Sequence, residues 1–240
     1  MCKYIPILLI CFGIRVSHAQ LPLALEYFDK GLEQYNAGNQ MKAIDYFSKS
    51  IDEDNKNEPA YYNRALAYYD LHQFSPALKD INKAIKLKKQ FANAYVLKGG
   101  ILIRSGKNKK AVQVLSEAVK YDQGAYLAYL LKGTAWYNLK NPEKALIEID
   151  KSLEIYPDFA DAFVYKGLIK YEAGEYKNAI TLFDNAVKSD SVNATAYFDR
   201  ALAKIKLDYI SSACLDFHRA AELGYPETEV YLKIHCNKKD

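Results

Sequence analysis

The sequence of 240 residues predicts an all-α protein, a right-handed solenoid of six helical hairpins followed by a short C-terminal capping helix. The first observation is that a glycine or alanine returns every 34 residues. The second is that an aromatic residue lies four positions before each of these small residues, and an alanine lies twelve positions after it. A fixed period of this length predicts that each unit is one supersecondary motif, which buries its apolar face against its neighbours.

The N-terminus precedes this array and has the pattern of a secretory signal peptide, predicted at residues 1–19. An apolar stretch at 5–14 follows a positive charge, and it is too short to cross a hydrocarbon core of ~30 Å. Cleavage after Ala19 is the favoured interpretation. Lipidation of Cys11 is the alternative, although the preceding Ile10 is larger than the residue usual at that position, and an uncleaved apolar N-terminus is a third.

The hairpins follow in order from Ala24 to Glu227 without an insertion. Because the aromatic and the small residue are four apart, they share one face of a first helix, and the small residue lets a second helix approach closely. The small residues are Gly31, Ala65, Gly99, Gly133, Gly167 and Ala201. The predicted repeats are 24–57, 58–91, 92–125, 126–159, 160–193 and 194–227, within an array that spans 20–227.

The clearest unit is FADAFVYKGLIKYEAGEYKNAITLFDNAVK, residues 159–188. Its signature positions hold Phe163, Gly167, Tyr171, Gly174, Tyr176, Ala179, Phe183 and Ala186. The pattern resembles the tetratricopeptide repeat (TPR) family, here of an exported bacterial envelope type. The resemblance implies a non-enzymatic scaffold that binds a protein or peptide partner in the concave groove lined by the first helices.

The resemblance also implies which side chains line that groove. They are Phe28, Leu32, Tyr35, Tyr62, Leu66, Tyr69, Val96, Leu130, Tyr137, Val164, Tyr171 and Phe198. The family's receptors for chaperone tails carry lysine and asparagine where Phe28 and Leu32 stand, so that function is disfavoured. An apolar, tyrosine-rich groove favours a partner's helix or extended segment. The alternative is that many of these side chains pack between repeats and meet no ligand.

A basic residue stands just before the small residue in all six repeats, where the family usually has leucine. Sixteen positions later the even repeats carry an acid and the odd repeats do not. We therefore expect ion pairs between the two helices of each even hairpin, with snorkelling of the long side chains as the alternative. The expected pairs are Arg64–Asp80, Lys132–Glu148 and Arg200–Asp216.

Charge is uneven along the chain. Residues 79–120 hold 11 basic and 2 acidic residues, whereas acidic residues outnumber basic ones on both sides of this segment after residue 19. This basic belt could meet an anionic surface, although a solvated face is the favoured interpretation. Its members are Lys86, Lys88, Lys89, Arg104, Lys107, Lys109 and Lys110. Nucleic acid is disfavoured because the chain as a whole has a formal net charge of only +4.

The C-terminus carries Cys214 and Cys236, which remain after removal of the signal peptide. Cys214 lies early in the last second helix, and a capping helix is predicted at 226–237 with a tail at 238–240. The two cysteines lie at equal distances from the intervening turn, so antiparallel helices bring them level. A disulfide is the favoured interpretation, ahead of free thiols, and a zinc site with the nearby histidines is disfavoured because the four ligands do not converge.

No catalytic motif occurs in the sequence, and we expect no enzyme, no cofactor and no metal. The leading function is a periplasmic or secreted protein-binding scaffold, with a Gram-negative bacterium as the favoured host. The alternative is a structural or assembly subunit of an envelope complex, which self-associates or attaches to an anionic surface through the belt at 79–120. The sequence does not name the partner.

Overall fold

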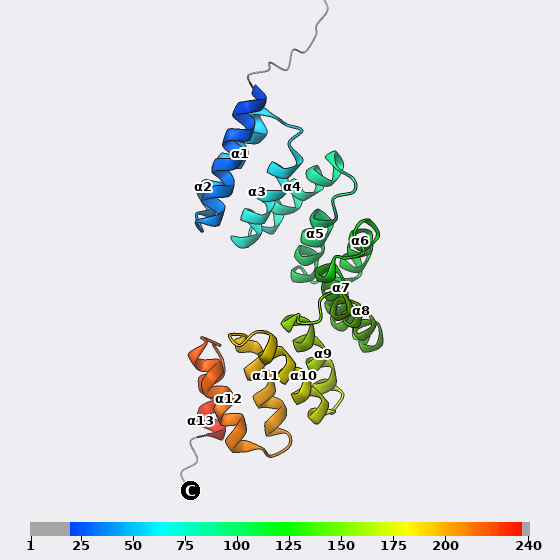
Figure 1. Ribbon diagram of the computed structural model, residues 1–240, viewed down its shortest axis with the longest axis vertical. Coiled ribbons are helices and arrows are strands. Elements are labelled where there is room, and N and C mark those ends of the chain that lie inside the picture. Colours follow the sequence, from blue (N-terminus) through cyan, green and yellow to red (C-terminus); the bar gives the residue numbers. More distant parts are fainter. Residues whose placement is uncertain (1–19, 237–240) are drawn as a thin grey trace, which may run out of the picture. The chain divides into compact units, whose positions relative to one another are not determined.

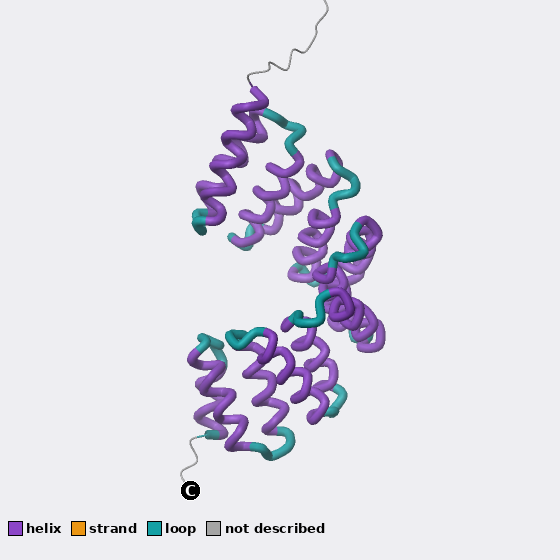
Figure 2. Tube along the Cα trace, in the orientation of Figure 1, coloured by secondary structure: helices purple, strands orange, loops and turns teal. Residues whose placement is uncertain are grey.

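The computed structural model describes residues 20–236, which form thirteen α-helices and no strand. Figures 1 and 2 show these helices joined by short loops. The helices are α1 (Gln20–Asn36), α2 (Gln40–Glu53), α3 (Glu58–Asp70), α4 (Phe74–Leu87), α5 (Ala92–Arg104), α6 (Asn108–Tyr121), α7 (Tyr126–Asn138), α8 (Pro142–Ile155), α9 (Ala160–Glu172), α10 (Tyr176–Ser189), α11 (Ala194–Ile205), α12 (Ile210–Glu222) and α13 (Thr228–His235). The predicted signal peptide, Cys11 and the tail at 238–240 lie outside the described residues.

Each predicted repeat contains one helical hairpin, and α13 follows the sixth. The helices α1 and α13 differ most from the expected ranges, because α1 begins at Gln20 and α13 is confined to Thr228–His235. The fold class predicted from the 34-residue period is therefore confirmed. The helices divide into two compact units, one that ends at Leu87 and one that begins at Lys88. Within the described part of the chain, no helix is both long and apolar enough to span a membrane.

The small residue of each repeat sets how closely the two helices of a hairpin approach. A Cβ atom added to Gly99 in α5 would lie 2.4 Å from Leu115 Cδ2 in α6, and one added to Gly167 in α9 would lie 2.6 Å from the Phe183 ring in α10. Leu115 and Phe183 are fully buried. Glycine at these positions thus leaves room for a large apolar side chain of the second helix.

The turns inside the hairpins alternate between two chemistries. The first, third and fifth hairpins use glycine at the left-handed position, and the second, fourth and sixth use His72, Lys140 and Asp208, with φ between 57° and 62°. The glycines are Gly38, Gly106 and Gly174. A residue with a Cβ atom pays a steric cost in this region that glycine does not. The turn chemistry therefore repeats every 68 residues rather than every 34.

Asparagine begins several of the helices. The side chains of Asn57, Asn141 and Asn193 accept hydrogen bonds from the backbone N–H groups of Ala60, Lys144 and Ala196. Such caps satisfy N–H groups that have no partner within the helix. Pro142 follows Asn141 as the first residue of α8, where its missing N–H costs nothing.

Candidate protein-binding site

The face of the first helices is where the groove was expected, and its side chains fall into two classes. Nine of the twelve expected groove residues are half-buried, and three are buried. Those three are Leu130, Val164 and Phe198, with 3–5% of their surface exposed. The expectation that these three side chains line an open groove is therefore wrong.

The three buried side chains pack between repeats, as the alternative interpretation required. Leu130 packs in one core cluster with Ala162 of the next repeat, and Val164 with Ala196 of the repeat after that. Phe198 stacks on Tyr225 with ring centroids 4.4 Å apart and also meets Tyr231 of α13 edge-on. In the fourth, fifth and sixth repeats this position thus supports the next repeat or α13, whereas Phe28, Tyr62 and Val96 at the same position are half-buried.

Two tyrosines expected in the groove hold neighbouring repeats together. The Tyr35 hydroxyl donates to Asp70 Oδ2 at 2.7 Å, and the Tyr137 hydroxyl donates to Glu172 Oε1. In both cases the acid lies 35 residues further along the chain, at the end of the next first helix. Burial and the hydrogen-bonded carboxylate raise the pKa of both phenols. Because the hydroxyl groups of both tyrosines already donate hydrogen bonds, a bound partner would contact their aromatic rings.

A cleft of about 420 Å³ opens beside the Tyr137–Glu172 hydrogen bond. It lies between the turn ends of the fourth and fifth hairpins. Its walls carry both charges, since Lys140 and Lys170 face Glu143 and Glu175, and Lys170 already pairs with Glu175 at 3.1 Å. Leu146 and Ile169 supply an apolar floor. This mixed lining suits an amphipathic segment better than a small charged ligand.

The three ion pairs expected in the even hairpins are present. Arg64 binds Asp80 through two nitrogens at 2.7 and 2.8 Å, and Arg200 binds Asp216 at 2.9 and 2.6 Å. Lys132 Nζ lies 3.0 Å from Glu148 Oε1. The other oxygen of Glu148 is buried without a hydrogen-bond partner in the described residues. The planar guanidinium satisfies both oxygens of its acid, whereas the ammonium satisfies only one.

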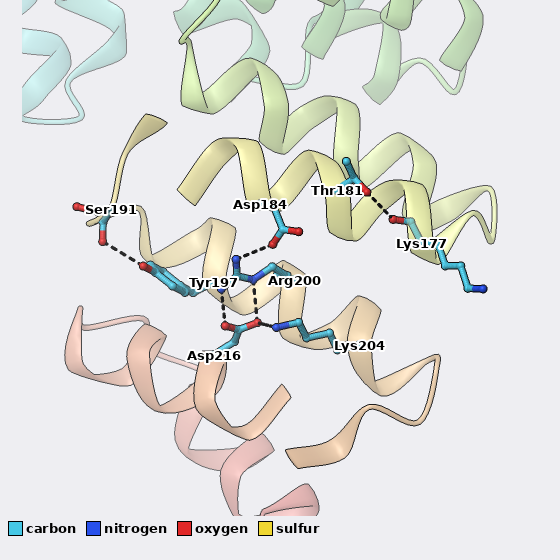
Figure 3. A network of polar contacts seen from close by, with 8 residues as sticks. All are labelled: Lys177, Thr181, Asp184, Ser191, Tyr197, Arg200, Lys204 and Asp216. Carbon is cyan, nitrogen blue, oxygen red and sulfur yellow. Dashed lines mark hydrogen bonds and ion pairs between the residues drawn. The ribbon is translucent and has the colours of Figure 1, made fainter. Parts of the chain in front are cut away.

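Two basic residues, Arg200 and Lys166, also pair with an acid of the preceding repeat, a contact that the sequence did not lead us to expect. Figure 3 shows Arg200 between Asp216 of α12 and Asp184 of α10, with Lys204 also directed at Asp216. Lys166 pairs with Asp150 at 2.6 Å in the same way. The backward partner lies sixteen residues earlier, so a search at that spacing would have found it. The cations thus link consecutive hairpins as well as the helices within one.

Asp199 differs from the other buried acids. Only 9% of its surface is exposed, and no described residue donates a hydrogen bond to it or forms an ion pair with it. Burial raises the pKa of Asp199 to about 7. Burial raises the pKa of Tyr137, Tyr171 and Tyr225, and the negative charge of Asp199 adds to the rise. Sequence reasoning missed Asp199, although a charged residue directly after a buried aromatic residue was a visible signal.

The sulfur atoms of Cys214 and Cys236 lie 2.01 Å apart, and their Cα atoms 5.7 Å apart, as in a disulfide. The bond joins α12 to the end of α13. Tyr231 and Leu232 of α13 pack against the cluster around Phe217. Among the described residues, no group of three or more histidine, cysteine, aspartate or glutamate side chains could hold a metal ion.

The seven residues of the basic belt are exposed and belong to more than one cluster. Lys88 and Lys89 precede α5, whereas Arg104 ends it and Lys107 follows it. The 13 residues of α5 separate these two groups by about 20 Å along the helix. Lys109 and Lys110 extend the second group into α6. The basic residues therefore form separate groups rather than the single continuous belt expected from the sequence.

Comparison with known proteins supports the fold. A family model described as tetratricopeptide repeat matches residues 59–91, and a second model of that description matches 98–158 and 166–204. Among curated relatives, DnaJ homolog subfamily C member 3 of Gallus gallus is 27% identical over 110 residues, which is 45% of this chain and 22% of the relative. RNA polymerase II-associated protein 3 of Mus musculus is 37% identical over 87 residues, 36% of this chain and 13% of the relative.

Several solved structures have the same fold. A chain of the APC/C hetero-tetramer Cut9–Hcn1 matches with a TM-score of 0.82 and 17% identity, over 91% of this chain and 44% of that one. PilW, a type IV pilus biogenesis factor, matches with a TM-score of 0.78 and 20% identity, over 88% and 98%. Pseudomonas aeruginosa PilF matches with a TM-score of 0.75 and 18% identity, over 90% and 99%.

The chain spans about a fifth or less of the length of those curated relatives. The structural likenesses, all at 20% identity or below, concern the fold alone. The two family models, however, share one description and together cover more than half of the chain. The chain therefore belongs to the tetratricopeptide repeat family, whose members mediate protein–protein interaction.

Proposed function

We propose that this protein is a non-enzymatic scaffold that binds a protein or peptide partner on the accessible face of its first helices. The observation that carries the proposal is the half-buried apolar row repeated on α1 and α3. Leu32 and Tyr35 on α1 are matched by Leu66 and Tyr69 on α3, and the Tyr35–Asp70 hydrogen bond joins the two helices. Half-buried aromatic and leucine side chains supply anchors for a partner at small entropic cost.

We also propose that the protein is exported and works in the bacterial envelope. The sequence of residues 1–19 supports this location, because it has the charge, apolar stretch and small residues of a signal peptide. The bonded cysteines support it as well, since disulfides persist in oxidising compartments. The likeness to PilW is a further support, as that pilus biogenesis factor matches over nearly its whole length.

Site-specific photo-crosslinking in the native host tests the binding face. A photoreactive amino acid placed at Leu32 or Leu66, on first helices, is expected to capture the partner. Met41 and Ile147 are matched controls, because they lie on the second helices α2 and α8 and are more than half exposed. Equal or exclusive capture from the control positions would contradict the proposed face.

Self-association is the second candidate, and one observation favours it. Leu215 of α12 and Val230 and Ile234 of α13 expose 72%, 58% and 56% of their surfaces at the last hairpin. An apolar group of this kind can bury itself against a second copy. Light scattering on the purified protein separates the two candidates. A monomer that carries a distinct crosslinked partner favours the scaffold, whereas a stable homo-oligomer favours the assembly subunit.

A further inference from the structure

Asp199 lies in α11 without the counter-charge that comparable acids in this protein possess. Asp80 and Asp216 are buried to a similar degree, with 3% and 5% exposure, and each is gripped by an arginine. Asp199 is 9% exposed and has neither a hydrogen bond nor an ion pair among the described residues. Burying a carboxylate without a partner is costly, which sets Asp199 apart from the paired acids.

The cations nearest in sequence are already engaged. Arg200 follows Asp199 directly, yet Figure 3 shows its guanidinium held between Asp184 and Asp216. Lys204 pairs with Asp216 at 2.7 Å. Consecutive residues of a helix point about 100° apart, and Asp199 takes no part in this network. Neither cation therefore neutralises Asp199.

The side on which Asp199 does face is lined by tyrosines from several elements. Its charge acts on Tyr137 of α7, Tyr171 of α9 and Tyr225 in the loop before α13. The other groups that act on these phenols are carboxylates and further tyrosines, among them Glu172 and Glu227. Lys140 lies over the Tyr137 ring, with Nζ 5.6 Å from its centroid, whereas no described cation contacts Tyr171, Tyr225 or Asp199. The half-buried rings and the carboxylate thus form one acidic, aromatic site at the C-terminal end of the first-helix face.

We propose that this site receives a basic side chain, arginine or lysine, from the bound partner, with Asp199 as its counter-ion. Such side chains pack their aliphatic stems on aromatic rings and place the charged head against a carboxylate. The small exposure of Asp199 restricts entry to the tip of one slender side chain. A metal ion would need more oxygen ligands than Asp199 supplies, and no such group occurs among the described residues.

This inference deepens the proposed function, since the partner is what carries the basic side chain. The probe is the peptide acetyl-Gly-Gly-Arg-Gly-Gly-amide, compared with the same peptide in which uncharged citrulline replaces arginine. Carbon-13 NMR of the aspartate carboxyl groups in the mature protein follows binding. The arginine peptide is expected to shift the Asp199 signal saturably, with an affinity at least tenfold above that of the citrulline peptide.

Two variants complete the test. Asp199→Asn preserves the shape of the side chain and is expected to lower affinity for the arginine peptide at least tenfold, as measured by isothermal titration calorimetry on wild type and variants alike. Glu229→Gln removes the same charge from an exposed position of α13 and is expected to change affinity less than twofold. A circular dichroism spectrum equal to that of the wild type shows that Asp199→Asn is folded. Equal binding of both peptides, or unchanged binding by Asp199→Asn, overturns the inference.

The two proposals fail in distinguishable ways. If crosslinking from Leu32 or Leu66 captures the partner while the arginine peptide shows no preference, only the Asp199 inference fails. If the arginine preference holds while those positions capture nothing, the proposed binding face fails and the Asp199 site stands.

Discussion

The buried carboxylates of this protein are of two kinds, those paired with a cation and Asp199, which has no such partner among the described residues. The acids of the even hairpins occupy regular positions of the repeat and are paired with arginine or lysine. The matching position of the other repeats holds Asp29, Asn63, Leu97, Leu131 and Tyr165, and Asp29 is exposed whereas Asp199 is buried. An unpaired acid in such a place lowers stability, which is the trade-off often found where a protein binds something.

Asp199→Asn should change the pH dependence of stability. The pKa of Asp199 rises from 3.8 to about 7 on folding, so between these values the folded state keeps a proton that the unfolded state releases. The free energy of unfolding of the wild type therefore falls as the pH rises from about 4 to about 7. Asparagine does not ionise, so the variant should exceed the wild type at pH 8 by roughly 2 to 4 kcal/mol.

Urea denaturation at pH 4 and pH 8 measures this difference. The two proteins should differ much less at pH 4, where the folded wild type keeps the Asp199 proton and the unfolded wild type has lost only part of it. Glu229→Gln serves as the control and should show no such change between the two pH values. A constant difference between wild type and Asp199→Asn across this range would contradict the prediction.

Among the elements, α13 depends most on a covalent link. It has only eight residues, and an isolated helix of that length is marginal in water. Its contacts with the sixth hairpin come from Tyr231 and Leu232, and the disulfide holds its end. The bond closes a loop with a sequence separation of 22, for which the chain-entropy model gives about 3 kcal/mol of stabilisation.

Cys236→Ser should therefore release α13 while leaving the preceding hairpins folded. Hydrogen exchange is expected to accelerate in residues 228–235 and to change little in α9 and α10. Reduction of the wild type should reproduce the effect, and reduction of the variant should add nothing. Alkylation and intact mass of the protein from its native compartment check the premise, because two alkylated thiols without prior reduction would contradict it.

At the scale of the whole molecule, the chain is two compact units joined after α4. Each unit has its own packing, so a cut between them leaves both cores intact. The joining segment contains Lys88 and Lys89, which are exposed and lie outside the helices. Lys56 and Lys107 are also exposed outside helices, but each lies between helices of a single unit.

Limited trypsin digestion is therefore expected to cut first after Lys88 or Lys89. The products should be one fragment for each unit, identified by intact mass, and the fragment that begins at residue 89 or 90 should resist further digestion. Lys88→Gln with Lys89→Gln should delay the first cleavage. Earlier cutting after Lys56 or Lys107 would show that the units are not the independent packing bodies described above.

The sequence predicted most of the architecture because the repeat is written in local, regularly spaced residues. Gly99 and Leu115 lie sixteen positions apart, and the same spacing separates Gly167 from Phe183. The contact between the two helices of a hairpin could therefore be inferred from the sequence. The ion pairs of the even hairpins could be predicted from the sequence for the same reason, because each acid follows its cation by sixteen positions. The division after Leu87 was not, since the 34-residue period continues through it unchanged.

The candidate site was less predictable, because it depends on how neighbouring repeats cover one another. Leu32 and Leu130 are both leucines on first helices, and the sequence does not distinguish their exposure. Leu32 is half-buried, whereas Leu130 is buried and packs with Ala162 of the next repeat. Phe198 is covered by Tyr225, at the end of the sixth repeat, and by Tyr231 of α13. Asp199 likewise lacks a counter-ion because the neighbouring Arg200 pairs with Asp184 and Asp216 instead, and the spacing of residues does not predict that Asp199 is left unpaired.

The alternating turns carry information about ancestry. Glycine in odd hairpins, and His72, Lys140 and Asp208 in even ones, recur every 68 residues, and so do the acids Asp80, Glu148 and Asp216. Two unrelated features with the same doubled period indicate that a pair of hairpins, rather than a single one, was the block copied during evolution. The repeating unit of this chain is thus a cassette of two hairpins, and the other two cassettes hold Asn63 and Leu131 where the third holds Asp199.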